Sequence, residues 1–502
     1  MDDRLMYRRQ FFIGGGWADP EGDERLPVIS PSSEEVVGEV PLATPADFDR
    51  AVAAARRAFD SGPWPSMAPA ERADVLSRVA ESLRKREADI TGVTVDEMGC
   101  AISQAPRAQT GMVAALFDYY AELCRGYEFE RFVVNGSRAG LVTNEPVGVV
   151  AVIVPWNAPV TLACWKTAPA LAAGCTVVIK PAPEAPLSNF ILAEALEEAG
   201  VPRGVVSVVP ADRVAGEHLV THPGVDKVAF TGSTAAGKRI MSLCGDQVKR
   251  VSLELGGKSA AIVLPGADLS AVLPVLVHGA MHLSGQVCGA QTRVLVPRSV
   301  YGPAVDAAAA AASHIPVGDP HDPSVVVGPL VASRQRDRVE GYIALGVAAG
   351  ARVASGGGRP ASLSRGWYVS PTILADVDNS MRVAREEIFG PVLCLIPYED
   401  EDDAVRIAND SPYGLAGGVW AGDPADGLRV ARRLRTGSIA INGSYPPFPL
   451  VPFGGFRESG LGRELGPEGL QSFLEPRSIG LPAELHSGAQ PGGFHMSSSN
   501  RS

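Results

Sequence analysis

The N-terminal part of the chain shows the periodicity of amphipathic helices. Apolar residues recur at helical spacing over 47–59, where Thr44 is the candidate N-cap, and again over 72–99 and 110–124. This spacing predicts three helices, of which the second is the longest.

From residue 147 the pattern changes to short continuous apolar runs that alternate with helical segments. Such runs are typical of strands that are buried on both faces of a parallel sheet. The alternation therefore predicts a doubly wound α/β fold. The expected strands are 148–157, 176–181, 205–210 and 227–232, and the expected helices are 161–174, 188–200 and one that begins near Ala215.

A second alternating region extends from about residue 257 to 457, so we expect a second parallel sheet. Two strand-like segments, 127–146 and 470–482, do not follow the alternation, and the Gly/Ser-rich tail over 486–502 is expected to be disordered. The strands expected in the second region are 259–264, 292–297, 391–398 and 438–442.

Composition narrows the class of protein. The chain has 502 residues and a formal net charge of −11, without a dense run of Lys and Arg, which argues against nucleic-acid binding. Prolines, Asn157 and Lys166 interrupt the most apolar stretch, 147–179, so we expect no membrane span. The N-terminus lacks the apolar segment of a signal peptide, and we expect a cytoplasmic protein.

The cysteines and histidines argue against disulfides and metal sites. Seven cysteines are scattered singly without a C-x-x-C pair, and the eight histidines include no H-E-x-x-H sequence. The sequence therefore indicates reduced thiols and no bound metal.

Two turns are candidates for nucleotide binding. "FTGSTAAG" (230–237) joins an expected strand to an expected helix, where Gly232 admits a close backbone approach and Ser233 adds a hydroxyl at a helix N-terminus that favours phosphate. Lys180 ends a strand at the edge of the sheet where doubly wound folds bind ligands. Taken singly, an ordinary turn and a solvated lysine explain these features as well.

Three further residues could act on a carbonyl group. Cys288, in "LSGQVCGA", becomes a nucleophile once its thiol is deprotonated. Glu254, in "LELGGK", has apolar and glycine neighbours that raise a carboxyl pKa toward the range of a general base. The amide of Asn157 could receive an oxyanion. Each has a plainer alternative in core packing or helix capping, and nearby His282 leaves a cysteine–histidine hydrolase open.

Together these motifs resemble the aldehyde dehydrogenase superfamily over about residues 10–482. Eight strings occur in the family's order, and the interval from Glu254 to Cys288 is also the usual one. The resemblance implies two doubly wound parallel-sheet domains and a β-strand oligomerisation extension. The strings are "PWNAP", "KPAPE", "FTGST..G", "LELGGK", "GQVC", "EEIFGP", "PFGG" and "GLGRE".

The resemblance also implies roles for individual residues. Cys288 would attack the aldehyde to form a thiohemiacetal, and Asn157 with the backbone N–H of Cys288 would hold the oxyanion. Hydride transfer to the nicotinamide would leave a thioester, and Glu254 would activate the water that releases the carboxylic acid. The implied contacts to NAD are Trp156, Lys180, Gly232, Ser233, Glu387 and Phe389.

One departure from the family concerns the choice between NAD and NADP. Many NAD-preferring members carry a glutamate three residues after the lysine of "KP", where it repels an extra phosphate. Pro183 stands at that position here, and Glu184 follows it. The resemblance therefore implies NAD as the preferred cofactor and leaves NADP open.

The implied aldehyde tunnel contains small groups at Ala158 and Gly289 and no arginine or lysine. We therefore expect a hydrophobic aldehyde of medium or bulky size. The residues that match the family's tunnel are Met112, Ala158, Trp165, Val287, Gly289, Tyr445 and Phe453.

Domain boundaries and an oligomer follow from the same resemblance. Residues 9–128 and 147–256 would form the dinucleotide-binding domain, and 257–467 the catalytic domain. Segments 129–146 and 468–485 would join subunits in a homodimer or homotetramer, because their strand edges would otherwise stay unpaired. Arg463 and Glu475 are candidates for tying this extension to the catalytic domain.

Two rival functions are compatible with the fold. A CoA-acylating aldehyde dehydrogenase would transfer the acyl group to CoA instead of water, and it would have little use for a base such as Glu254. A non-catalytic dinucleotide-binding protein would not need Cys288, Glu254 and Asn157 together.

Overall fold

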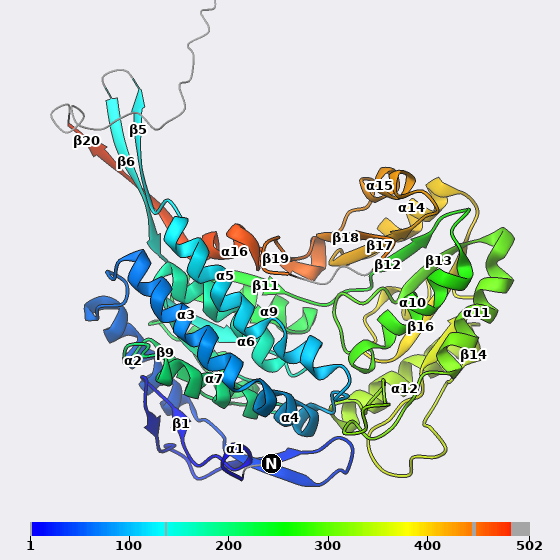
Figure 1. Ribbon diagram of the computed structural model, residues 1–502, viewed down its shortest axis with the longest axis horizontal. Helices are drawn as coiled ribbons and strands as arrows, with labels where there is room; N and C mark the ends of the chain where they lie inside the picture. Colours follow the sequence, from blue (N-terminus) through cyan, green and yellow to red (C-terminus); the bar gives the residue numbers. More distant parts are fainter. Residues whose placement is uncertain (1–2, 136–137, 444–447, 483–502) are drawn as a thin grey trace, which may run out of the picture.

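Two largely parallel sheets form the centre of the molecule (Figure 1). The computed structural model describes residues 3–135, 138–443 and 448–482. Within these residues the first sheet has eight strands, and its four inner pairs from β11 to β9 are parallel. Its order is β19-β11-β10-β7-β8-β9-β1-β2, with bounds Gly460–Leu461, Arg250–Glu254, Lys227–Thr231, Val149–Ile153, Thr176–Lys180, Val206–Val208, Phe11–Phe12 and Trp17–Ala18.

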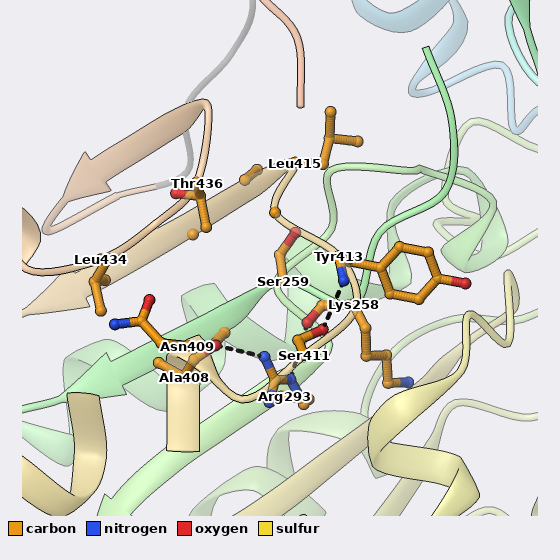
Figure 2. A pocket seen from close by; sticks show the side chains of 14 residues that line it. Lys258, Ser259, Arg293, Ala408, Asn409, Ser411, Tyr413, Leu415, Leu434 and Thr436 are labelled. Carbon is orange, nitrogen blue, oxygen red and sulfur yellow. Dashed lines mark hydrogen bonds between the residues drawn. The ribbon is translucent and has the colours of Figure 1, made fainter. Parts of the chain in front are cut away.

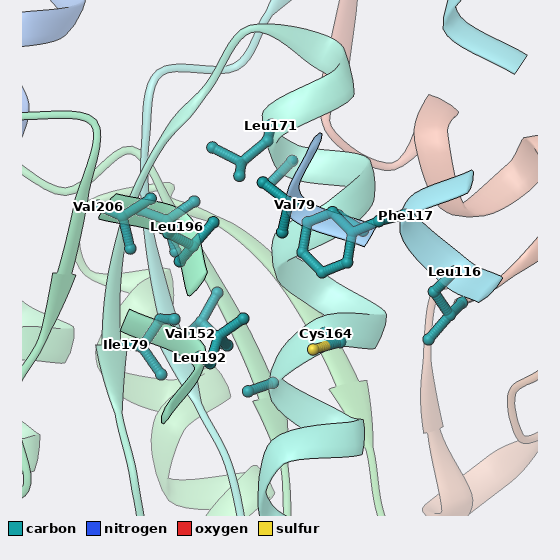
Figure 3. Packing of buried hydrophobic residues seen from close by; sticks show 14 of the residues in the cluster. Val79, Leu116, Phe117, Val152, Cys164, Leu171, Ile179, Leu192, Leu196 and Val206 are labelled. Carbon is teal, nitrogen blue, oxygen red and sulfur yellow. The ribbon is translucent and has the colours of Figure 1, made fainter. Parts of the chain in front are cut away.

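Strand β7 shows why helices cover both faces of the first sheet. Val150 and Val152 enter one apolar core, whereas Val149, Ala151 and Ile153 enter another, because successive side chains of a strand point to opposite faces. Figure 3 shows the first of these cores. Its helices are α3 (Pro69–Lys85), α5 (Val113–Gly126), α6 (Pro159–Ala173) and α7 (Leu187–Glu198), and those of the opposite core are α2 (Pro45–Ser61), α8 (Arg213–Thr221) and α9 (Thr234–Gly245).

The second sheet repeats this arrangement. Ala260 and Ile262 of β12 face one core, and Ala261 and Val263 face the other. The order is β14-β15-β16-β13-β12-β17-β18, with bounds Arg352–Ser355, Thr372–Ala375, Val392–Tyr398, Arg293–Pro297, Ala260–Val263, Ala416–Trp420 and Ser438–Ile441. The helices are α12 (Ser333–Ala348), α13 (Arg382–Arg385), α14 (Glu401–Asn409) and α15 (Pro424–Ala431) against one core, and α10 (Leu269–Met281) and α11 (Tyr301–Ser313) against the other.

The expected doubly wound α/β fold is therefore confirmed. Strand β19 lies within the range expected for the catalytic domain, 257–467, but it pairs with β11 of the first sheet through Glu254 and Gly460. The remaining elements are α1 (Asp3–Met6), α4 (Glu87–Met98), α16 (Gly466–Gln471), the hairpin β3 (Arg25–Ile29) with β4 (Val36–Pro41), and the short helical turns Pro106–Thr110, His282–Gly285, Arg298–Val300 and Arg457–Ser459.

The two segments that broke the alternation form a sheet of their own. β5 (Glu130–Asn135), β6 (Arg138–Pro146) and β20 (Leu474–Leu481) are antiparallel and project from the main body (Figure 1). Glu475 of β20 forms an ion pair with Arg250 at the start of β11. Arg463 donates instead to the carbonyls of Gly455 and Gly462, so these two candidates do not pair with each other.

Some sequence-based boundaries were wrong. The helix expected over 72–99 is two helices, because Arg86 leaves helical geometry (φ −104°, ψ 7°) and its side chain binds Glu198 of α7 instead. The helix expected from residue 110 begins at Val113, since a π-helical turn occupies Pro106–Thr110. Strands β14, β15 and β17 were not predicted; β17 contains Gly417 and Gly418, which weaken the local strand signal.

Among the described helices, none combines the length and apolar character that a membrane crossing requires.

Candidate active site

The chain crosses from the first sheet to the second immediately after Glu254, the last residue of β11. A Cβ atom on Gly256 would lie 2.5 Å from Oε2 of Glu387, and one on Gly257 would lie 2.5 Å from the carbonyl oxygen of Cys288. Both distances are too short for a real side chain. The absence of side chains at Gly256 and Gly257 therefore lets Glu387 and the backbone of Cys288 approach the segment that follows Glu254.

Cys288 differs from the other cysteines in its exposure. All seven cysteines lie in the described residues; six are buried and Cys288 alone is partly exposed. Burial, which is the largest cause, and the carboxylates of Glu387 and Glu254 together raise the pKa of the Cys288 thiol to about 12. The thiol is therefore protonated at neutral pH, and it needs a base before it can act as a nucleophile.

Glu254 is a buried carboxyl group, with 5% of its surface exposed, and among the described residues neither carboxyl oxygen has a hydrogen-bond partner. Burial raises its pKa well above the ordinary value, and the neighbouring carboxylate of Glu464 adds to that rise. Lys166 and Arg463 act in the opposite direction. A carboxyl group in these surroundings is suited to taking and releasing a proton near neutral pH.

Glu464 and Lys166 form a buried ion pair beside Glu254. Their charged atoms are 2.6 Å apart, and Lys166 Nζ also donates to Oγ1 of Thr231 at 2.5 Å. The sequence analysis gave neither residue a role: Glu464 appeared only within "GLGRE", and Lys166 only as a residue that interrupts an apolar stretch. A lysine in a helix that is otherwise apolar was itself the available signal, because a buried cation needs a partner.

Asn157 is tied to the segment that carries Cys288. Its side-chain Nδ2 donates to the backbone carbonyl of Gln286 at 2.9 Å. The backbone carbonyl of Asn157 accepts from Nε2 of Gln109 at 3.0 Å. An amide nitrogen carries two hydrogens, so one N–H of Asn157 remains for another acceptor. Neither Gln286 nor Gln109 was singled out from the sequence.

Two of the residues implied for NAD, Lys180 and Ser233, lie at the carboxyl edge of the first sheet. Lys180 ends β8 and is 7% exposed; burial lowers the pKa of its ammonium group to about 8, against the influence of Glu184 and Asp212. Ser233 is the N-cap of α9, and its hydroxyl oxygen accepts from the N–H of Ala236 at 3.3 Å. A buried cation and a helix N-terminus at one edge suit a pyrophosphate.

The structure places Gly232 in two contacts that the sequence did not predict. Its N–H donates to the carbonyl of Glu254 at 3.0 Å, so this amide is not free for a phosphate. A Cβ atom at Gly232 would lie 2.4 Å from the ring of Phe230. The glycine therefore makes room for an aromatic ring of β10.

The other implied cofactor residues surround the crossing segment. Glu387 accepts from the N–H of Gly257 at 3.2 Å, and burial raises its pKa to about 7. The rings of Trp156 and Phe389 meet edge to face, with centroids 5.3 Å apart. Phe389 has a φ of 61°, a left-handed backbone that a bulky residue rarely adopts.

Most of the implied tunnel residues share one apolar core. Trp165 and Phe453 meet edge to face at 5.4 Å, and Met112, Ala158 and Cys288 pack against the same core. Val287 packs against a separate cluster, together with Trp156. A Cβ atom at Gly289 would make an ordinary contact with Ala416, and Tyr445 lies outside the described residues.

A small cavity behind the crossing segment surrounds the guanidinium group of Arg293 (Figure 2). Its accessible volume is about 10 Å³, which is too little for a substrate. Arg293 is 1% exposed and donates to the carbonyls of Lys258, Ile407 and Ala408. Its contribution is structural, because it fastens the segment after Glu254 to the second sheet.

Comparison with known proteins agrees with this fold. An aldehyde dehydrogenase of Mycobacterium tuberculosis, solved in complex with NAD+, superposes with a TM-score of 0.93 and 45% identity, covering 95% of this chain and 99% of that one. A mutant of aldehyde dehydrogenase C from Pseudomonas syringae, in complex with NAD+ and octanal, superposes with a TM-score of 0.90 and 41% identity, covering 94% and 96%. The fold is therefore that of NAD-dependent oxidoreductases.

The sequence comparisons give the family. The model of the aldehyde dehydrogenase family matches residues 17–479, and a geranial dehydrogenase of Castellaniella defragrans is 48% identical over 475 residues, 94% of this chain and 98% of the relative. The chain belongs to the aldehyde dehydrogenase family, and it oxidises an aldehyde to the carboxylic acid with NAD as cofactor. The family expected from the eight sequence strings is confirmed.

The exposure of Cys288 leads to a prediction about thiol reactivity. Iodoacetamide should modify Cys288 before any other cysteine, because the other six are buried. The reaction should be slow near neutral pH and should accelerate about tenfold per pH unit, since only the thiolate reacts and the pKa is raised to about 12. Peptide mapping by mass spectrometry at several pH values measures both features. First modification at a buried cysteine, or a rate independent of pH, would contradict this account.

Proposed function

We propose that Cys288, Glu254 and Asn157 are the catalytic residues of this aldehyde dehydrogenase. The observation that carries the proposal is their convergence from three distant segments. The Cys288 carbonyl lies against Gly257, three residues after Glu254, and the Asn157 amide binds the carbonyl of Gln286, two residues before Cys288.

In this proposal Cys288 provides covalent catalysis. Its thiol proton passes to the carboxylate of Glu254, which later releases it to water, while the sulfur attacks the aldehyde carbon and a thiohemiacetal forms. The negative charge that develops on the aldehyde oxygen is received by the remaining N–H of Asn157 and by the backbone N–H of Cys288. Donors fixed in a site of low polarity stabilise such charge more than water does, because they need no reorientation.

Glu254 serves the second half of the reaction. Its carboxylate takes a proton from water, the resulting hydroxide attacks the thioester carbon, and the carbon–sulfur bond breaks to release the acid and the Cys288 thiolate. The Glu464–Lys166 pair tunes this base, since the two groups shift the pKa of Glu254 in opposite directions. Because its pKa is raised, Glu254 is a stronger base than an ordinary carboxylate.

NAD supplies, when bound, the acceptor for the hydride that leaves the aldehyde carbon. We propose that Lys180 and Ser233 hold its adenosine ribose and pyrophosphate, and that Glu387 holds the nicotinamide ribose. Trp156 and Phe389 would line the cleft, and Gly232 would shape the turn before α9. The fit rests on the buried Lys180, the N-terminus of α9, and the missing side chain at Gly256 beside Glu387.

We propose a hydrophobic aldehyde of medium or bulky size as substrate. The support is the apolar core that Trp165 and Phe453 share with Met112, Ala158 and Cys288. One relative is named for geranial and one similar structure holds octanal, and both are hydrophobic aldehydes. Val287, Gly289 and Tyr445 complete the tunnel in this proposal.

The domain division and the oligomer are also proposals. Residues 9–128 and 147–256 would bind the dinucleotide, and 257–467 would contribute the catalytic cysteine. The projecting sheet β5–β6–β20 would join subunits in a homodimer or homotetramer, supported by the exposed apolar side chains of Phe132 and Val134 on its edge strand. Seven free cysteines support a cytoplasmic location.

An aldehyde panel tests the proposed reaction. With NAD, the wild-type protein should form reduced nicotinamide fastest with long aliphatic, terpenoid or aromatic aldehydes, and free acid should appear without CoA. Cys288→Ala should show no turnover while the Kd for NAD stays within about twofold, since the cysteine is not a cofactor contact. Absorbance of the reduced nicotinamide, recorded with NAD and NADP in parallel, measures the result. Preference for short or carboxylated semialdehydes would exclude the proposed substrate class, and turnover by the alanine variant would exclude the nucleophile.

Charge changes around Glu254 should move the pH profile in opposite directions. Glu254 acts in its ionised form, so activity is lost as the pH falls through its raised pKa. Glu464→Gln removes a negative neighbour, lowers that pKa and should move the acid limb of kcat about one unit toward lower pH, whereas Lys166→Met should move it about one unit toward higher pH. Circular dichroism controls for folding. Shifts in the same direction would contradict this electrostatic account.

The proposed interface predicts a change in mass. Light scattering should report a dimer or tetramer for the wild type, and the double variant Phe132→Lys with Val134→Lys should dissociate it, because two buried charges oppose association. Val214→Lys, at an exposed valine of α8, is the matched control and should keep the oligomer. A monomeric wild type would refute the proposed interface.

A further inference from the structure

The turn that precedes Cys288 has an unusual backbone. Leu283 (φ 49°, ψ 38°) and Ser284 (φ 57°, ψ 33°) both adopt the left-handed conformation, and Gly285 follows with a φ of 74°. Residues with side chains avoid this region, and they persist there only where the surrounding contacts hold them. A Cβ atom at Gly285 would lie 2.0 Å from the carbonyl oxygen of Gly390, so the turn is also pressed against its neighbour.

Side chains hold this turn in place. The N–H of Leu283 donates to Oε1 of Gln104 at 2.9 Å, and the hydroxyl of Ser284 donates to the carbonyl of Gly328 at 2.8 Å. Gln286 contributes both ends of its amide: Nε2 donates to the carbonyl of Leu283 at 3.1 Å, and Oε1 accepts from the N–H of Val331 at 3.0 Å. Gln286 is 1% exposed, so water does not compete for these bonds.

The backbone of Gln286 orients Asn157. Its carbonyl accepts one N–H of the Asn157 amide at 2.9 Å. Because that bond fixes the plane of the amide, it also fixes the direction of the second N–H. The Gln286 peptide therefore sets the position of Cys288, two residues later, relative to the Asn157 donor.

We propose that Gln286 is a positioning residue for the nucleophile and the oxyanion donor. The inference rests on the proposed roles of Cys288 and Asn157. Gln286 touches neither the aldehyde nor the cofactor in this scheme. Its side chain clamps the strained turn to the segment at Val331, and the clamped peptide keeps the sulfur and the amide hydrogen at the spacing that carbonyl attack requires. A displacement of about 1 Å in such a geometry lowers the rate about a hundredfold.

Two substitutions separate this role from general packing. Gln286→Leu keeps the size of the side chain and removes both hydrogen bonds of the side chain. Its kcat should fall about tenfold to a hundredfold, while KM and the Kd for NAD stay within about twofold.

In Gln286→Glu the protonated carboxyl can still donate to the carbonyl of Leu283 and accept from the N–H of Val331. The ionised form instead places a charge against the Leu283 carbonyl. The kcat of this variant relative to wild type should therefore fall as the pH rises, whereas the ratio for Gln286→Leu should not vary with pH.

Gln291→Leu is the matched control. Gln291 is also a buried glutamine with two side-chain hydrogen bonds, from its Nε2 to the carbonyl of Gly443 at 3.3 Å and from Trp420 Nε1 to its Oε1 at 3.2 Å. These two bonds lead to Trp420 of β17 and to Gly443 after β18, and not to the turn before Cys288. The loss of these two hydrogen bonds in Gln291→Leu should lower the thermal stability of the protein and leave kcat within about twofold of wild type.

The outcomes distinguish this inference from the proposed function. Wild-type kcat in Gln286→Leu, or equal losses of kcat in Gln286→Leu and Gln291→Leu, would overturn the positioning role. A flat pH ratio for Gln286→Glu would overturn it as well, and that variant remains informative at low pH if the leucine variant fails to fold. Turnover by Cys288→Ala would instead overturn the proposed function, whatever the glutamine variants do.

Discussion

The site depends on one constraint, the close approach of Gly256 to the carboxylate of Glu387 and of Gly257 to the backbone of Cys288. These residues carry the chain from β11 of the first sheet to β12 of the second, and side chains at either position would collide with Glu387 or Cys288. Because both are glycines, the end of β11 and the loop before β13 come within contact distance. Glu254 ends strand β11, whereas Cys288 and Asn157 lie in the loops before β13 and α6, so the two sheets and α6 fix the separation of these groups.

The burial of Glu254 at this junction lowers the stability of the fold and gives the site a base with a raised pKa. Within the part of the chain that the structure describes, Glu254 has no hydrogen-bond partner for either oxygen, and Glu464 lies close enough to disfavour its charge further. A protein selected for stability alone would pair or remove such a group. Here Lys166 balances Glu464 and leaves Glu254 with a raised pKa, so the protein keeps a proton acceptor whose affinity for the proton is set by its surroundings. The strained turn at Leu283 and Ser284 is a second local cost next to Cys288.

How far the site could be predicted varied from residue to residue. Cys288, Glu254 and Asn157 stand in recognisable strings, and the structure brings their segments together. Gly232 was expected to admit a close backbone approach; in the structure its N–H donates to the carbonyl of Glu254, and a side chain there would meet the ring of Phe230. The break at Arg86 carries no glycine or proline, so no local signal announced it; a contact with Glu198 in another helix accounts for it.

The sequence by itself determined the alternation of strands and helices, the burial of both sheet faces and the family, because each is expressed within short windows of the chain or in strings of fixed order. The tertiary structure alone decided which distant residues meet: Lys166 with Glu464, Gln286 with Asn157, and Arg250 with Glu475. Local periodicity reports which face of a segment is buried, but it carries no information on which segment lies opposite. The pKa of Glu254 depends on such neighbours, and so only the folded chain fixes it.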